Sequence, residues 1–202
     1  MSERPLRILI AEDEAMNLLG FKSFLADIGH QVVGEAYDGV MAVELARELS
    51  PDLIIMDIKM PKMDGIKALE YINQDSERII PCIFVTAFSD IQLINKAKDV
   101  GAFSYLIKPV NYESLMAAIE ITMVRFNEYL ELKKELITAR TDLHNRKIIE
   151  RAKGILMDEF YFKEQQAMEY LQKKSRNENK KIIEVAKEII RMKEALLKND
   201  KY

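Results

Sequence analysis

The chain has 202 residues, 49% of them hydrophobic, and a formal net charge of −3. This length allows one domain and a substantial second segment, and the apolar content is sufficient for a packed core. No apolar run approaches the roughly 18 residues of a membrane span, so we expect no membrane partner. The short apolar stretch near the N-terminus is interrupted by acids, which predicts no signal peptide. The single cysteine, Cys82, cannot form an internal disulfide and fits a reducing, cytoplasmic location.

Charge is distributed unevenly along the chain. Residues 1–111 contain 11 basic and 17 acidic residues, whereas residues 147–202 contain 14 basic and 10 acidic residues. A basic end on an acidic body indicates a polyanionic partner for that end, although many charged helices have a similar surplus. The two histidines and one cysteine form no cluster with the spacing of a zinc site.

The first half of the chain alternates short apolar runs with amphipathic segments. The runs have strand length and are rich in Ile, Val or Phe: LRILIA (6–11), QVVGEA (31–36), DLIIMD (52–57), IIPCIFVTA (79–87) and FSYLIK (103–108). Apolar residues recur at helical spacing in the segments between them, which are 14–28, 40–49, 65–73 and 89–100. This alternation predicts an α/β fold, a doubly wound five-stranded parallel sheet of the flavodoxin-like type with helices on both faces.

The second half is predicted to be entirely helical. Residues 112–150 contain no glycine or proline and predict one long helix, and shorter helices are expected over 164–175 and 180–197. Heptad spacing relates Met123, Leu130 and Ile137, and also Ile119 and Phe126, as in the seam of a coiled coil. Residues 112–122 can simply cover the sheet. A helix of about 40 residues is about 60 Å long, however, and extends beyond a small domain, so we expect a two-stranded dimer.

Acidic residues follow two of the predicted strands. Glu12 and Asp13 follow the first strand, and Asp57 ends the third. In a sheet of order 2-1-3-4-5 these strands are neighbours, so the three carboxylates converge outside their carboxyl ends. Such a cluster is repulsive without a cation, and oxygen ligands suit Mg²⁺. Thr86 and Lys108 end the fourth and fifth strands, where a hydroxyl and an ammonium suit a phosphoryl group.

The stretches IAEDE, DLIIMDIKMPKMDG, VTAFSD and YLIKPV together resemble the receiver domain of two-component response regulators, over residues 5 to about 122. The resemblance implies that a histidine kinase phosphorylates Asp57. It also implies Mg²⁺ as cofactor, with ligands from Glu12, Asp13, Asp57 and the backbone carbonyl of Lys59. A receiver-like domain that has lost phosphorylation is the alternative.

The same resemblance assigns three further positions. Lys108 pairs with the phosphoryl oxygens, and Thr86 donates a hydrogen bond to one of them. Tyr105 matches the aromatic residue that turns inward when Thr86 moves toward the phosphate. The bond between Lys108 and Pro109 is expected to be cis.

Residues 146–190 resemble the ANTAR domain, an RNA-binding antiterminator module. The matching positions are Ala152-Lys153-Gly154-Ile155-Leu156-Met157, Ala167, Leu171, Ser175, Asn179, Val185 and Ala186. The resemblance implies a three-helix bundle that binds paired hairpins in nascent mRNA through their loops. Two departures, the turn EFYFKE and the pair Lys180-Lys181, indicate that RNA contacts differ in detail from those of the family.

Several residues of this segment are candidates for RNA contacts. The basic ones are Arg151, Lys153, Lys173, Lys174, Arg176, Lys180 and Lys181, and each can equally belong to a solvated helix face. Gly154 costs a helix about 1 kcal/mol relative to alanine, so either RNA or another backbone approaches it, or helices pack closely there. Tyr161 and Phe162 can stack on a base, although the pattern favours a core or staple role.

These features predict a receiver domain over 1–122, a coiled-coil dimerisation helix over 123–145 and an ANTAR domain over 146–202. The predicted function is a phosphorylation-controlled transcription antiterminator, not an enzyme. It dimerises through the helix 112–145 when phosphorylated and then binds nascent mRNA. A DNA-binding transcriptional regulator is the main alternative. A signalling module that acts only through protein contacts is the other.

Overall fold

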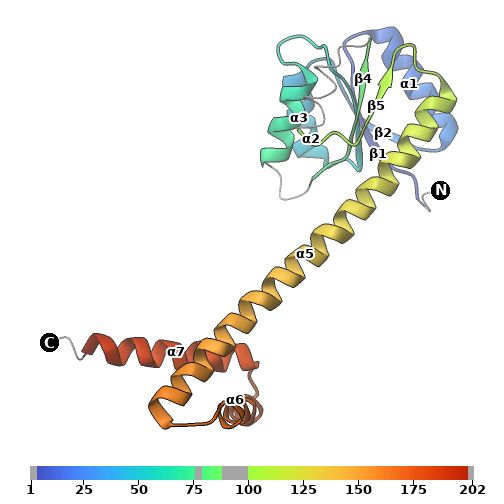
Figure 1. Ribbon diagram of the computed structural model, residues 1–202. Coiled ribbons are helices and arrows are strands. Elements are labelled where there is room, and N and C mark those ends of the chain that lie inside the picture. The colour runs from blue at the N-terminus through green and yellow to red at the C-terminus, as the bar shows by residue number, and fades with distance from the viewer. Residues whose placement is uncertain (1–3, 76–78, 88–99, 200–202) are drawn as a thin grey trace. The chain divides into compact units, whose positions relative to one another are not determined.

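The computed structural model describes residues 4–75, 79–87 and 100–199 (Figure 1). The five strands are β1 (Arg7–Ala11), β2 (Gln31–Ala36), β3 (Leu53–Asp57), β4 (Cys82–Thr86) and β5 (Ser104–Ile107). All neighbouring pairs are parallel and the strand order is β2-β1-β3-β4-β5. The predicted strands, their parallel pairing and their order are therefore confirmed.

Helices connect and follow the strands. They are α1 (Ala15–Ile28), α2 (Gly39–Leu49), α3 (Gly65–Asp75), α5 (Tyr112–Phe160), α6 (Glu164–Glu178) and α7 (Ile182–Asn199). The helix predicted over 89–100 lies outside the described residues up to residue 99. Among the residues with a described placement, no helix combines the length and the apolarity that crossing a bilayer requires.

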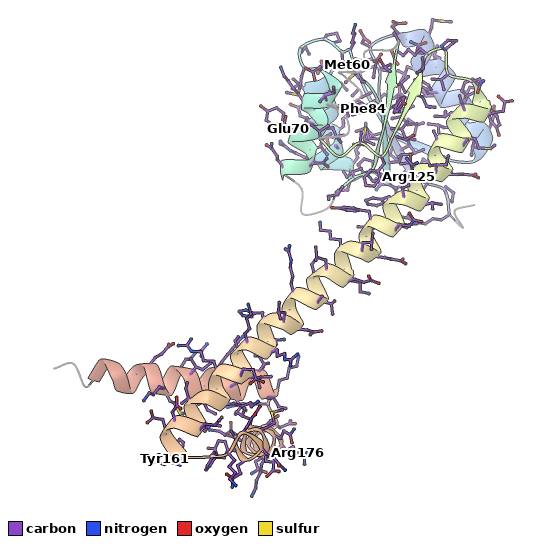
Figure 2. All side chains as sticks on the ribbon, in the orientation of Figure 1. Met60, Glu70, Phe84, Arg125, Tyr161 and Arg176 are labelled. Atoms are coloured by element: carbon purple, nitrogen blue, oxygen red, sulfur yellow. The ribbon has the colours of Figure 1, made fainter. Side chains whose placement is uncertain are left out.

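The sheet has an apolar layer on each face. Leu9, Ile54 and Phe84 belong to a buried cluster with residues of α2 and α3, and Phe84 is marked in Figure 2. Their neighbours Ile10 and Ile55 point the other way, into a cluster with α1 and the first turns of α5. Every residue of β3 and β4 is buried, as expected for central strands covered on both faces.

Burial in the first unit bears on Cys82 and on one predicted heptad stripe. Cys82 is a free and fully buried thiol, and burial raises its pKa above the ordinary value. Ile119 and Phe126, one of the two predicted heptad stripes, are buried on the receiver side of α5. These two residues therefore stabilise the first unit and do not form part of a seam for a partner helix.

The chain forms two compact units, Met1–Leu130 and Glu131–Tyr202. The second unit has a core of its own, to which α5, α6 and α7 each contribute. Its fully or almost fully buried members include Ala152, Leu156, Ala167, Leu171, Val185 and Ala186. The predicted three-helix arrangement is confirmed, and Ala152, Ala167 and Ala186 pack inside it. The predicted limits of the three domains stay predictions.

The long helix extends further than predicted. The sequence predicts one helix over 112–150, whereas α5 continues to Phe160 and includes Gly154. A lone glycine weakens a helix without ending it. The helix stops where Tyr161 adopts a left-handed conformation with φ of 55°, and α6 begins at Glu164.

Candidate functional site

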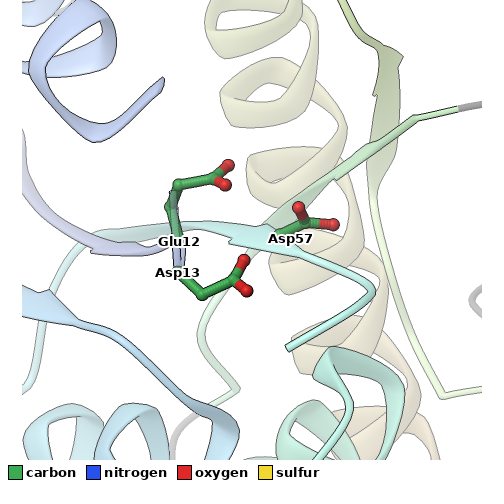
Figure 3. A group of neighbouring side chains, drawn as sticks. All are labelled: Glu12, Asp13 and Asp57. Atoms are coloured by element: carbon green, nitrogen blue, oxygen red, sulfur yellow. The ribbon is translucent and has the colours of Figure 1, made fainter. Parts of the chain in front are cut away.

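The carboxyl ends of β1 and β3 bring three acidic side chains together, as predicted. One carboxylate oxygen from each of Glu12, Asp13 and Asp57 lies within 4.8 Å of the others (Figure 3). Glu12 is fully buried and Asp57 is almost so, while Asp13 is exposed. The cluster therefore has two fixed carboxylates and one that faces solvent.

Lys108 follows β5 and reaches into this cluster. Its Nζ lies 2.5 Å from Asp57 Oδ2 and donates a hydrogen bond to Glu12 Oε1 at 2.9 Å. Burial alone disfavours the ammonium, but the hydrogen bonds to Asp57 and Glu12 outweigh it, and the pKa of Lys108 rises above 10.5. At neutral pH the site thus contains a fixed cation beside the carboxylate of Asp57.

The acidic cluster fits a further cation. Both carboxylate oxygens of Glu12 lie 2.9 Å from Nζ of Lys108, which also contacts Asp57. One ammonium does not balance three carboxylates, and a metal ion among them would reduce the remaining repulsion. The donors are all oxygens, which suits Mg²⁺. The residues present therefore fit the ion that the sequence predicts.

The loop after β3 holds Asp57 in place. The amide of Lys59 donates a hydrogen bond to Asp57 Oδ1 at 3.0 Å, and the amide of Gly65 donates to the carbonyl of Ile58 at 2.9 Å. A Cβ at Gly65 would lie 2.2 Å from the carbonyl oxygen of Asp57, so only glycine fits where the loop returns. The metal contact predicted for the carbonyl of Lys59 stays a prediction.

The remaining predicted receiver positions lie on β4 and β5. Thr86 is buried, and its carbonyl accepts a hydrogen bond of 2.8 Å from the amide of Lys108. This bond places the two residues side by side. Tyr105 is exposed on β5. The peptide bond between Lys108 and Pro109 is cis, as predicted. The roles of Thr86 and Tyr105 stay predictions.

Sequence reasoning missed an ion pair that ties this loop to α2. Nζ of Lys62 donates a hydrogen bond of 2.6 Å to Asp38 Oδ2, and Asp38 Oδ1 caps α2 by accepting from the amide of Met41. The hydrogen bond from Lys62 is the main reason that the pKa of Asp38 lies below its usual value. Asp38-Gly39 before an amphipathic segment is an N-cap signal, but no pattern indicated Lys62 as its partner.

Four of the basic RNA candidates are paired with acids of the second unit. Lys153 is buried, and its Nζ lies 3.0 Å from Glu150 and 2.7 Å from Glu164. Hydrogen bonds to Glu164 and Glu150 raise the pKa of Lys153. The other pairs are Arg151–Glu194, Lys174–Glu178, Lys180–Glu178 and Lys180–Glu188. Side chains held in this way are less available to phosphates than unpaired ones.

The other three basic candidates are different. Lys173, Arg176 and Lys181 are exposed and have no ion pair to any residue whose placement is described, and Arg176 is marked in Figure 2. They lie in the second half of α6 and in the turn before α7.

A Cβ at Gly154 would meet no described atom within 4 Å. Close helix packing therefore does not explain this glycine.

Comparison with known proteins identifies the family. The response regulator receiver domain matches residues 8–120, and the ANTAR domain matches residues 138–190. The chain belongs to the response regulators. This response regulator is 42% identical over 189 residues to the transcriptional regulatory protein PdtaR of Mycobacterium tuberculosis (strain ATCC 25618 / H37Rv). The matched region covers 92% of this chain and 91% of PdtaR.

Other relatives match the receiver part of this response regulator. The chemotaxis protein CheY of Bacillus subtilis (strain 168) is 41% identical over 119 residues, covering 58% of this chain and 97% of CheY. The solved receiver domain of the putative response regulator NarL from Mycobacterium tuberculosis superimposes with a TM-score of 0.55 at 26% identity, covering 57% of this chain and 94% of that one. Residues 121–137, between the two family matches, lie within α5.

Proposed function

We propose that this response regulator is a phosphorylation-controlled transcription antiterminator that binds hairpin loops in nascent mRNA. The observation that carries the proposal is the placement of Asp57 beside Lys108 and two further carboxylates, in a chain that also has an ANTAR domain. The first feature suits a phosphoryl acceptor, and the second suits an RNA ligand.

Phosphoryl transfer to Asp57 requires a nucleophile and charge stabilisation. A carboxylate oxygen of Asp57 attacks the phosphorus of a phosphohistidine on the kinase, an O–P bond forms, and the N–P bond breaks. The histidine nitrogen that leaves takes up a proton. Mg²⁺ held by Glu12, Asp13, Asp57 and the Lys59 carbonyl would neutralise the phosphoryl oxygens. Lys108, already fixed at this point, would exchange its contact with Asp57 for one with the phosphoryl group.

Phosphorylation then changes the population of receiver conformations. Thr86 hydrogen-bonds a phosphoryl oxygen and Tyr105 moves inward, which alters the surface near β5 and α5. The part of the helix 112–145 that follows Phe126 pairs with its copy in a second chain and brings two ANTAR domains together. Two linked domains bind two hairpins more tightly than one, because the second contact is intramolecular. Loop bases suit this role, since proteins read unpaired RNA bases more readily than duplex RNA.

The proposal is tested by titrating a labelled RNA with two hairpins into full-length protein at fixed salt. Protein treated with acetyl phosphate and Mg²⁺ is compared with untreated protein and with an Asp57→Ala variant, and a duplex DNA of equal length is the competitor. Tight binding only by treated wild type is expected. Equal RNA affinity in all three samples would show that RNA binding does not depend on phosphorylation. Binding of duplex DNA alone would favour a DNA-binding regulator.

A further inference from the structure

The turn between α5 and α6 exposes an unusual group of aromatic side chains. Tyr161, which is labelled in Figure 2, is 90% exposed. Phe160 is 62% exposed, and Tyr170 on α6 is 41% exposed. Phe162 is partly buried and packs against the core of the second unit. An exposed group of large apolar rings is unfavourable in water and often marks a binding surface.

Three of these four rings form a row with Phe162 in the middle. The centroid of Phe162 lies 5.9 Å from that of Phe160 and 5.9 Å from that of Tyr170, with tilted planes. Phe162 thus anchors the two exposed rings on either side to the bundle core. Because the row is fixed before any ligand arrives, little side-chain freedom is lost when a ligand stacks on it.

Tyr161 is also in an unfavourable backbone conformation. Its φ of 55° lies in the left-handed region, which glycine adopts far more readily than an aromatic residue does. The side chain gains no burial in return, since it is almost completely exposed. Strain without a packing contribution from the side chain is a reason to look for a ligand.

Exposed cations lie next to the row. Of the nearby acids, Glu159 pairs with Lys193 and Glu164 with Lys153. Glu169 accepts a hydrogen bond of 3.0 Å from the neutral Gln165 amide, and Asp158 is exposed with no ion pair to a described residue. Lys163 and Lys173 are exposed and form no ion pair within the described part of the chain. Lys173 follows Tyr170 by three residues and so lies on the same side of α6.

We propose that Phe160, Tyr161 and Tyr170 form a stacking platform for an unpaired base of the bound RNA, with Lys163 and Lys173 contacting the flanking phosphates. The inference deepens the proposed function and rests on it. Aromatic rings next to cations are the combination that binds single-stranded nucleic acid, because every base has a π-face. An apolar surface of a partner protein would form no favourable contact with the ammonium groups of these two lysines.

The test uses full-length protein treated with acetyl phosphate and Mg²⁺, and the two-hairpin RNA with 2-aminopurine in one loop. Tyr161→Gly removes the ring and suits the left-handed conformation, so this variant keeps or gains thermal stability. Its Kd for the RNA is expected to rise roughly tenfold, as for loss of one stacked base. Tyr161→Phe keeps the ring and the affinity. Tyr170→Ala and Tyr170→Phe form a second matched pair, and wild type quenches 2-aminopurine more than Tyr161→Gly does.

Other results would contradict the stacking platform, the proposed function or both. If wild type binds the RNA tightly and Tyr161→Gly binds it equally well, the stacking platform is wrong and the proposed function stands. If wild type does not bind the RNA at all, both are wrong. Sedimentation of the same samples tests whether a second copy of the chain, and not RNA, covers these aromatic side chains. A lower dimer affinity in Tyr161→Gly, with unchanged RNA affinity per dimer, would assign the aromatic row to contact with a second copy of the chain.

Discussion

The packing of the second unit does not require a glycine at position 154. Gly154 lies within α5, one residue after the buried Lys153, yet a Cβ there would meet no described atom within 4 Å. The helix therefore carries the backbone freedom of glycine without a contact that needs it. Close approach of a ligand backbone remains the explanation that the proposed RNA binding supplies.

The first prediction is that Gly154→Ala stabilises the protein and weakens RNA binding. Alanine fits the space and should raise the free energy of unfolding by up to about 1 kcal/mol, measured by urea denaturation followed by circular dichroism. If RNA approaches this backbone, the added methyl group raises the Kd for the two-hairpin RNA. Gly20→Ala is the matched control, because Gly20 also lies in a helix with nothing within 4 Å.

The two variants separate the two explanations of Gly154. Gly20→Ala lies in the receiver and should stabilise it while leaving the RNA affinity unchanged. An RNA affinity of Gly154→Ala equal to that of wild type would show that no ligand comes close to this position, and the glycine would then have no functional role.

For single residues, the sequence predicted where a side chain lies better than it predicted which side chain pairs with it. The convergence of Glu12 and Asp57 follows from strand order alone, since parallel neighbours end at the same edge. The burial of Lys153 could not be predicted in that way. Its carboxylate partner Glu164 begins the next helix, and a sequence does not show how a turn orients two helices.

Among the elements, α5 differs most from its predicted role. The predicted seam contains Met123, which packs partly against the receiver core, and continues through Leu130 and Ile137. The intervening stripe begins with Ile119 and Phe126 but continues as Lys133 and Arg140. A different set has apolar residues at alternating spacings of three and four: Leu132, Leu136, Ala139 and Leu143. Its three leucines are each more than half exposed.

The second prediction is that dimerisation depends on this second set. A two-stranded coiled coil needs apolar residues at both core positions of the heptad, which the predicted seam lacks. Leu136→Lys should therefore raise the dimer dissociation constant of the phosphorylated protein at least about tenfold, as measured by sedimentation. Ile137→Lys, at the adjacent exposed position on the other stripe, is the control and should have a small effect. The reverse result would restore the predicted seam.

The extent of α5 also shows what a sequence pattern leaves open. Neither proline nor a second glycine occurs between residues 110 and 160, so the expected turn EFYFKE (159–164), and not a helix-breaking residue, indicated where the helix ends. The end is set by the left-handed Tyr161, and left-handed residues are rarely aromatic. The strands were predicted more closely, because a buried parallel strand is a short apolar run with clear limits.

At the scale of the whole molecule, the buried clusters of the two units share no residue within the part of the chain that is described. The receiver clusters lie within Met1–Leu130, and the cluster of α5, α6 and α7 lies within Glu131–Tyr202. The carboxylates Glu12, Asp13 and Asp57 all belong to the first unit. A metal ion bound there contributes free energy to the unit that holds its ligands.

The third prediction is that Mg²⁺ stabilises the first unit alone in the unphosphorylated protein. An ion that binds only the folded state at about one hundred times its Kd raises the free energy of unfolding by about 2.7 kcal/mol. Hydrogen exchange followed by mass spectrometry should show slower exchange in β1 and β3 with Mg²⁺, and unchanged exchange in α6 and α7. Asp13→Asn is the control, because Asp13 is exposed and its loss removes one ligand charge without opening the core. Slower exchange in α6 and α7 as well would show that the two units unfold together. No change in any segment of wild type would mean that the acidic cluster does not hold the ion.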